Sequence, residues 1–229
     1  MHQPRLEGIR ACVFDAYGTL FDYASAALRC RDMLGNKWEL FARLWREKQL
    51  QYTWLRSLQS RHADFFEVTR DALDFTMDAL EVTDSQLRER LMNTYLVLDA
   101  FPEVEETLRR LRAMGLKTAI LSNGTPEMLR HAVTNAGIDH LLDMVLSIEE
   151  VGVYKTHPSV YQLAVDRLSM DRKEILFQSS NGWDAYAASA FGMRVVWCNR
   201  YGQPPERLPG RPDCEIKTLA ELPALLAAG

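Results

Sequence analysis

The 229-residue sequence has only four cysteines, which form neither a CxxC pair nor a cluster with histidine. This spacing favours neither a zinc site nor a disulfide framework. Cys12 and Cys198 lie within apolar runs and are predicted to be core residues. No apolar run approaches the roughly 20 residues of a transmembrane helix, and the polar residues 1–10 do not resemble a secretory signal. We therefore expect reduced thiols, a cytoplasmic location and no membrane partner.

Motifs of several other protein classes are also missing. The chain contains no glycine-rich dinucleotide motif, no P-loop and no Gly-x-Ser-x-Gly nucleophile elbow. Acidic residues outnumber basic ones by 31 to 27, and the net charge of -4 argues against a nucleic-acid partner. Hydrophobic residues make up 47% and charged residues 25%, as in ordinary globular domains.

Short apolar segments alternate with helical patterns through much of the chain. This alternation is typical of βαβ units, and it predicts an α/β fold with a Rossmann-like, doubly wound parallel sheet and right-handed crossovers. The predicted strands are residues 9–15, 116–121, 144–148, 174–178 and 193–198, and the helical patterns cover 104–114, 125–136, 158–168 and 183–191.

Residues 22–101 differ, because they show helical periodicity without any strand pattern. Leu40, Phe41, Leu44 and Trp45 are predicted to share one helix face, a stripe that Leu55 and Leu58 continue. We expect an all-helical cap over residues 22–101, inserted into a core formed by residues 1–21 and 102–229. The proline-rich residues 203–212 are predicted to be a surface loop.

Polar residues follow four of the predicted strands. In an open parallel sheet, ligands bind at the carboxyl ends of the strands. Such residues also serve as helix caps and turn formers, which accounts for any single position. Four sets at one edge favour a ligand site. The sets are Asp15 with Thr19, Ser122 with Asn123, Lys155, and Ser179 with Asn181 and Asp184.

The order Asp-x-x-Gly-Thr, Ser-Asn and then Lys resembles the haloacid dehalogenase superfamily over almost the whole chain. Most members are Mg²⁺-dependent phosphatases with a second Asp two residues after the nucleophile. Tyr17 stands there in this chain, and a phenol with a pKa of about 10 is a poor acid for that step. The segments 14–22, 44–56, 120–124 and 179–184 resemble the L-2-haloacid dehalogenases more narrowly, and phosphatases usually carry an acid where Asn181 stands.

This resemblance implies hydrolysis of (S)-2-haloacids, that is L-2-haloalkanoic acids, to D-2-hydroxy acids. A carboxylate attacks carbon in an SN2 step and the resulting ester is hydrolysed, with no metal or cofactor. The implied partners are the haloacid, the halide ion and a second copy of the chain as a homodimer. The implied catalytic residues are Asp15, Thr19, Lys155, Ser179, Asn181 and Asp184, and the implied substrate-binding residues are Tyr17, Arg46, Leu50, Phe65, Ser122, Asn123, Tyr161 and Trp183.

The chemistry suggests individual roles. Asp15 is the expected nucleophile, Thr19 orients it and Lys155 holds its charge. Arg46 and Asn123 are expected at the halide, and Ser122 with the start of the following helix at the substrate carboxylate.

The remaining side chains are expected to shape the pocket or to act on water. Tyr17, Leu50, Phe65 and Trp183 would form an apolar wall. Asp184, with Ser179 and Asn181, would position water. Asp184 could be the base or a structural partner of Lys155.

Two departures from the family pattern and two other functions stay open. Glu47 follows Arg46 where relatives often carry Gln, and it would disfavour anions unless it points outward. Thr156 follows Lys155 where Pro is common, which would loosen the lysine loop. The alternatives are a phosphatase of the same superfamily acting with Mg²⁺ on a small phosphate ester, and a non-catalytic protein that kept the fold.

Overall fold

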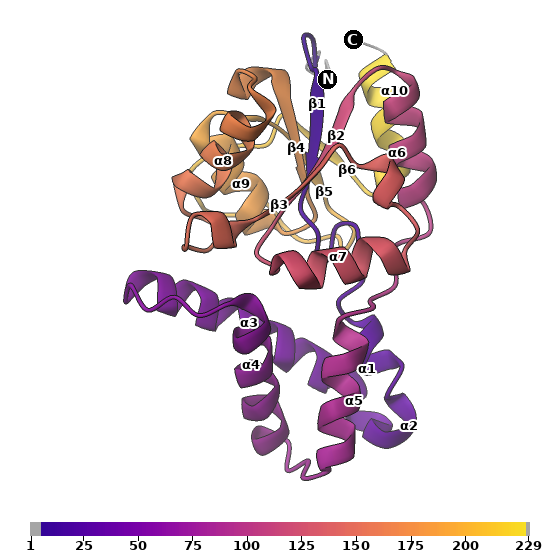
Figure 1. The fold of residues 1–229 in the computed structure, drawn as a ribbon, viewed down its shortest axis with the longest axis vertical. Helices are drawn as coiled ribbons and strands as arrows, with labels where there is room; N and C mark the ends of the chain where they lie inside the picture. Colours follow the sequence, from indigo (N-terminus) through magenta and orange to yellow (C-terminus); the bar gives the residue numbers. More distant parts are fainter. Residues whose placement is uncertain (1–5, 228–229) are drawn as a thin grey trace.

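A computed structural model describes residues 6–227 of the chain. Residues 1–5 and 228–229, which the expected core includes, lie outside the described residues. Figure 1 shows a sheet covered by helices and, beyond one end of its strands, a separate group of helices. No helix within residues 6–227 is long and apolar enough to cross a membrane.

The sheet is parallel and has six strands, which confirms the predicted α/β class. The first predicted strand lies near the middle of the sheet, flanked on both sides by later strands. All five predicted segments form strands, and a sixth, three-residue strand was not predicted. In spatial order the strands are β3 (Met144–Ser147), β2 (Lys117–Ser122), β1 (Ala11–Phe14), β4 (Ile175–Ser179), β5 (Arg194–Cys198) and β6 (Cys214–Ile216).

Helices cover both faces of the sheet, as a doubly wound fold requires (Figure 1). α6 (Val104–Ala113) packs with α10 (Leu222–Ala227), and α8 (Pro158–Leu168) packs with α9 (Gly182–Phe191) on the opposite side. α7 (Pro126–Asn135) connects β2 to β3. Cys12 and Cys198 are fully buried within this core, as predicted.

The predicted helical region is helical and contains two short helices that were not predicted. Asp64 and Asp84 start α4 and α5 because their side chains accept hydrogen bonds from backbone N–H groups of the first turn. The helices are α1 (Ser25–Leu28), α2 (Arg31–Leu34), α3 (Trp38–Leu58), α4 (Phe65–Ala79) and α5 (Ser85–Tyr95).

The predicted apolar stripe of α3 is partly wrong. The buried face carries Phe41, Trp45, Gln49 and Thr53, at a four-residue spacing. Leu40, Leu55 and Leu58 are exposed instead, with Leu58 83% exposed. The predicted Phe41 and Trp45 are buried, together with Ala42, but the pattern missed Gln49 and Thr53 because these two buried residues are polar.

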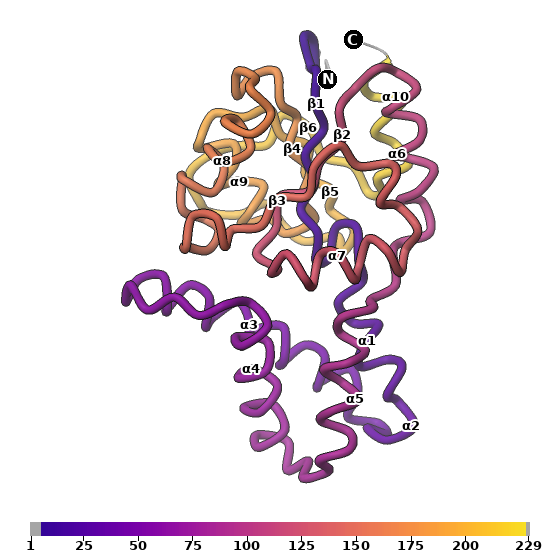
Figure 2. Tube along the Cα trace, viewed as in Figure 1, coloured from indigo at the N-terminus to yellow at the C-terminus, as the bar shows by residue number. Residues whose placement is uncertain are grey.

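Two chain segments join the helical group to the sheet, and they lie side by side (Figure 2). The Asp22 backbone N–H donates to Asp99 O, and the Phe101 N–H donates to Leu20 O. This pairing sets the helical group against the carboxyl ends of the strands, where the polar residues of the sequence motifs gather.

Candidate active site

The loop after β1 presents Asp15 at the carboxyl edge of the sheet. Gly18 adopts a φ of 92°, in the left-handed region that favours glycine, and its N–H donates to Phe21 O. The turn brings Thr19 back toward Asp15, whose side chain is almost completely buried.

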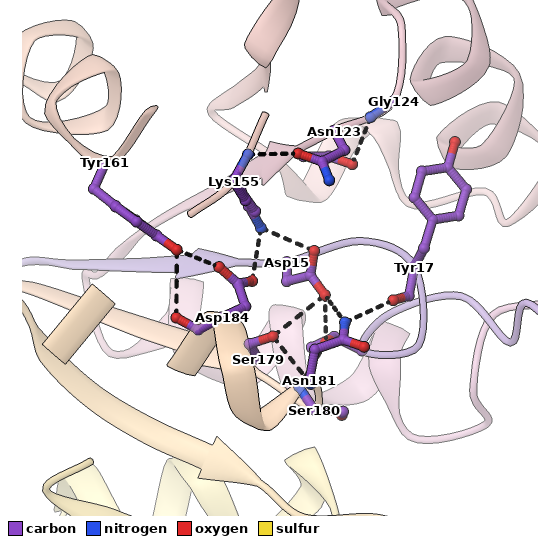
Figure 3. A network of polar contacts seen from close by, with 12 residues as sticks. Asp15, Tyr17, Asn123, Gly124, Lys155, Tyr161, Ser179, Ser180, Asn181 and Asp184 are labelled. Carbon is purple, nitrogen blue, oxygen red and sulfur yellow. Dashed lines mark hydrogen bonds and ion pairs between the residues drawn. The ribbon is translucent and has the colours of Figure 1, made fainter. Parts of the chain in front are cut away.

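One oxygen of the Asp15 carboxylate accepts three hydrogen bonds. Asp15 Oδ2 lies 2.7 Å from Asn181 Nδ2, 3.0 Å from Thr19 Oγ1 and 3.3 Å from Ser179 Oγ (Figure 3). The Thr19 hydroxyl oxygen accepts from the Ser180 N–H at 2.8 Å, so its proton is directed to Asp15. These donors hold the carboxylate in one orientation.

Lys155 links two carboxylates, Asp15 of the loop after β1 and Asp184 of the first turn of α9. Its Nζ lies 2.9 Å from Asp15 Oδ1 and 2.8 Å from Asp184 Oδ2, and the ammonium is almost fully buried. Burial lowers the pKa of Lys155, but the charges and hydrogen bonds of Asp15 and Asp184 outweigh burial and raise it. Lys155 is therefore a cation at neutral pH.

Asn123 holds the lysine loop from the side of β2. Its Oδ1 accepts from the Lys155 backbone N–H at 3.1 Å. This hydrogen bond anchors the lysine loop, which Thr156 was expected to loosen. The donor end of the Asn123 amide is directed away from this bond.

Asp184 is fully buried beneath Lys155. Its Oδ1 accepts from the Tyr161 hydroxyl at 2.7 Å, so both of its oxygens have donors. Burial raises the pKa of Asp184. Tyr161, expected at the substrate, directs its hydroxyl to Asp184 instead, and burial and that carboxylate raise the pKa of Tyr161.

Arg46 reaches the sheet from α3. Its Nη2 donates to Tyr17 O at 3.3 Å and to Asn181 Oδ1 at 3.5 Å, a weak bond at the distance limit. The guanidinium carbon lies 5.1 Å from the ring centre of Tyr23. Glu47, the next residue, is exposed, so its carboxylate points outward. The helical group thus places a cation directly beside the Asp15 loop.

Aromatic rings pack around Tyr17. Its ring centre lies 5.4 Å from that of Phe65 and 5.7 Å from that of Tyr95. A Cβ at Gly124 would lie 2.8 Å from the Tyr17 hydroxyl, so this close approach requires glycine. Burial raises the pKa of Tyr17, and the ring points away from Asp15 (Figure 3).

Three further residues expected at the substrate are Ser122, Leu50 and Trp183. Ser122 is buried, and its Oγ accepts from the Gly124 N–H at 3.1 Å, the turn-forming role weighed as the alternative. Leu50 is half-buried on α3. Trp183 packs edge-on against Trp54 of α3, with ring centres 5.5 Å apart.

Three contact residues of this site were missed by sequence reasoning. Tyr23 lies under the Arg46 guanidinium, Tyr95 packs on Tyr17, and Gln49 accepts a hydrogen bond from Arg46. Only Gln49 had a readable signal, because residues three apart on a helix are neighbours. The two tyrosines meet the site through tertiary packing alone.

The hydrogen-bond donors of this site orient the Asp15 carboxylate, and the cations Lys155 and Arg46 attract anions. Across residues 6–227, no group of three or more His, Cys, Asp or Glu side chains is arranged to hold a metal ion. The arrangement is an oriented carboxylate, a buried lysine next to it, and an arginine and aromatic rings contributed by the helical group.

Comparisons with known proteins agree with this geometry. Residues 9–192 match the model of the haloacid dehalogenase-like hydrolases. The chain is 43% identical to (S)-2-haloacid dehalogenase 4A of Burkholderia cepacia, over 97% of this chain and 96% of that protein. It is 44% identical to (S)-2-haloacid dehalogenase 1 of Pseudomonas sp. (strain CBS-3), over 96% and 98%.

A solved structure adds a covalent complex to the comparison. L-2-haloacid dehalogenase from Xanthobacter autotrophicus, with chloropropionic acid covalently bound, superposes with a TM-score of 0.90 at 36% identity. The match covers 96% of this chain and 98% of that one. By sequence, fold and the residues around Asp15, the chain belongs to the haloacid dehalogenase-like hydrolases and, within them, to the L-2-haloacid dehalogenase family.

Proposed function

We propose that the protein is an (S)-2-haloacid dehalogenase, which hydrolyses L-2-haloalkanoic acids to D-2-hydroxy acids. The observation that carries the proposal is the Asp15 carboxylate, with three donors on Oδ2 and the Lys155 ammonium on Oδ1. The two relatives described above, which match almost the whole of this chain, are (S)-2-haloacid dehalogenases.

Asp15 is the nucleophile of the proposed first step. Each carboxylate oxygen has about two lone-pair sites. The three donors on Oδ2 saturate that oxygen, whereas Oδ1 has Lys155 as its donor. Oδ1 therefore attacks C2 of the substrate from the side opposite the halogen. The C–O bond forms, the C–halogen bond breaks, and the halide leaves with the bonding electrons.

Arg46 and Asn123 receive the halide in this scheme. A departing halide requires no proton but gains a full negative charge, which a guanidinium and an amide N–H stabilise. Arg46 is the cation that the helical group contributes, and the donor end of the Asn123 amide is left for the halide because its oxygen accepts from Lys155. Tyr17, Leu50, Phe65 and Trp183 form the apolar wall, and Ser122 lies on the side of the substrate carboxylate.

Water completes the proposed reaction by attacking Cγ of Asp15. Its proton passes to a base, the bond between Cγ and the substrate oxygen breaks, the leaving alkoxide takes up a proton from that base to become the 2-hydroxyl group, and the Asp15 carboxylate is regenerated. C2 inverts once, in the first step, so an L substrate yields a D product. Asp184 is the candidate base, because burial raises its pKa. Lys155 and Tyr161 bind both of its oxygens, so it must exchange one of these partners for water.

Halide release tests the function directly. The wild type should release chloride from L-2-chloropropionate and form D-lactate, and Asp15→Asn should release none. Asp78→Asn is a matched control on the exposed side of α4 and should keep full activity. A wild type that releases no halide, or that instead hydrolyses an aryl phosphate with Mg²⁺, would overturn the proposal.

Isotope labelling tests the ester. In a single turnover with excess enzyme in heavy-oxygen water, the label should enter the Asp15 carboxylate and not the new hydroxyl of lactate. Label in the first hydroxyl group formed would mean that water attacks C2 directly.

We further propose a division into a core of residues 1–21 and 102–229 and a cap of residues 22–101, with the substrate bound between them. A cytoplasmic location is supported by the four cysteines, all of which are free. A homodimer is supported by the exposed side chains of Leu40, Leu55 and Leu58 on α3. Light scattering should give twice the chain mass, and Leu58→Glu should reduce it.

A further inference from the structure

A buried glutamine holds the Arg46 guanidinium from within the helical group. Gln49 lies one helical turn after Arg46 on α3 and is 1% exposed. Arg46 Nη1 donates to Gln49 Oε1 at 2.7 Å, a shorter bond than those from Nη2 to Tyr17 O at 3.3 Å and Asn181 Oδ1 at 3.5 Å. The firmest bond of the arginine is therefore made to its own helix.

The orientation of the Gln49 amide is determined by its other neighbours. The Thr69 hydroxyl donates to Phe65 O at 2.6 Å, so toward Gln49 its oxygen can only accept. Gln49 Nε2 donates to that oxygen at 2.7 Å. The amide nitrogen must therefore face Thr69 on α4, and the amide oxygen must face Arg46.

Tyr95 of α5 completes the network. Its hydroxyl lies 3.0 Å from Gln49 Nε2 and 3.2 Å from Gln49 Oε1. The same ring stacks on Tyr17, whose backbone oxygen accepts from Arg46. Three helices thus converge on one amide, and that amide directs one oxygen at one guanidinium nitrogen.

We propose that Gln49 is a positioning residue for the dehalogenation reaction, which aims the Arg46 guanidinium at the departing halide. This inference rests on the proposed function. Gln49 touches neither halide nor Asp15, and it acts only through Arg46. Without it, Arg46 loses its shortest hydrogen bond and keeps the two longer ones to Tyr17 O and Asn181 Oδ1, together with its contacts to the Tyr23 ring and the Tyr95 hydroxyl.

The chemistry of the amide accounts for glutamine rather than glutamate. A neutral acceptor orients the guanidinium and leaves its positive charge available to an anion. A carboxylate would form an ion pair with Arg46 and compete with the halide. It would also present an acceptor to Thr69, whose hydroxyl already donates to Phe65 O.

The first experiment compares Gln49→Met with a matched variant of the same helix. Gln51 lies two residues further along α3, is exposed, and bonds Lys48 at 2.8 Å. We expect Gln49→Met to lower kcat/KM for L-2-bromopropionate roughly 10- to 100-fold, since a small misplacement of a positioning group has effects of this size. It should also weaken inhibition by bromide. Gln51→Met should change neither value.

The second experiment separates positioning from a merely structural role. Gln49→Met is combined with Arg46→Lys, because a lysine is a point charge that cannot use the fork geometry. If Gln49 acts through Arg46, its replacement has little further effect on kcat/KM in the Arg46→Lys background. An equal fold-loss in both backgrounds would overturn the inference, as would unchanged bromide inhibition in Gln49→Met.

A charge variant gives an independent readout. Gln49→Glu should weaken bromide inhibition more than Gln49→Met does, because it pairs the cation as well as losing the donor to Thr69. Stronger or equal bromide binding by Gln49→Glu would contradict the inference. An active wild type with unaffected Gln49 variants rejects only this inference, whereas an inactive wild type rejects the proposed function.

Discussion

Asn181 stands at the N-cap position of α9, yet its amide nitrogen lies 2.7 Å from Asp15 Oδ2 and makes no capping bond. Asn is among the preferred N-cap residues, and a free amide would satisfy an orphan N–H of the helix. Here the amide instead binds the carboxylate and Tyr17 O, at 3.1 Å. The side chain serves the site rather than the helix.

Replacing Asn181 by Asp distinguishes these two roles. Aspartate is an equally good N-cap, so a residue that only capped α9 would tolerate the change. Because Asn181 makes no capping bond and its amide binds the buried Asp15, a carboxylate in its place should lower the midpoint of thermal unfolding. Halide release should fall by about 100-fold or more, because the variant exchanges a donor for a second negative charge next to Asp15. Steady-state kinetics and thermal melts on the same preparation check this, and wild-type activity in Asn181→Asp would contradict the assignment.

Lys155 is predicted to be essential for stability as well as for activity. Lys155→Met leaves Asp15 and Asp184 buried with no cation between them. Breaking a buried ion pair costs about 3–5 kcal/mol, and denaturant unfolding should show a loss of this size. The double variant Lys155→Met/Asp184→Asn should recover part of the stability without activity. Full stability in the single variant would argue against the observed network.

Arg200 is predicted to stabilise the junction between sheet and helical group. Its Nη2 donates to Thr19 O at 2.9 Å, its Nη1 pairs with Glu103 at 2.5 Å, and its guanidinium lies 4.0 Å from the Phe101 ring centre. Arg200→Met should lower the free energy of unfolding by about 1.5–3 kcal/mol, since it removes the charged partner of the half-buried Glu103 and leaves that carboxylate with hydrogen bonds to its backbone and Thr218 only.

The comparison with Glu103→Gln identifies the source of that loss. Arg200→Met/Glu103→Gln should be more stable than Arg200→Met, because no half-buried carboxylate is left without its cation. Urea unfolding of the three variants measures the difference. If Arg200→Met unfolds like the wild type, the junction does not depend on this arginine.

Alkaline stability should depend on Cys12. Burial raises the pKa of its thiol from 9.0 to about 12. Above pH 9 the unfolded chain loses this proton while the folded chain keeps it, so the unfolded state binds fewer protons and stability falls as pH rises. One such group contributes a slope of about -1.4 kcal/mol per pH unit between these values.

Cys12→Ala removes this contribution. Between pH 9 and 12, the free energy of unfolding of Cys12→Ala should fall less steeply than that of the wild type. The two slopes should differ by about 1.4 kcal/mol per pH unit. Below pH 8 the two curves should run parallel, separated only by the cost of the lost sulfur contacts. Denaturant titrations across the pH range provide the measurement, and parallel curves throughout would mean that the thiol is not protected.

Local sequence patterns predicted most of the sheet and the polar edge of the site. The apolar segment before Asp15 and the glycine that follows it are short-range signals, and each predicted strand is found in the structure. β6 was not predicted because Cys214–Ile216 is too short to show a periodic pattern. α1 and α2 were not predicted for the same reason, since each spans four residues.

Short-range patterns specify which side chains stand at the ends of the strands, because apolar runs, turn residues and motif spacing are properties of neighbouring residues. Packing of distant segments specifies which of these side chains meet. Lys155 lies 140 residues from Asp15 in the chain, and only packing of the sheet brings its ammonium between two carboxylates. The Gln49 amide likewise acquires its direction from Thr69 of α4 and Tyr95 of α5, and no pattern along the chain encodes these two contacts.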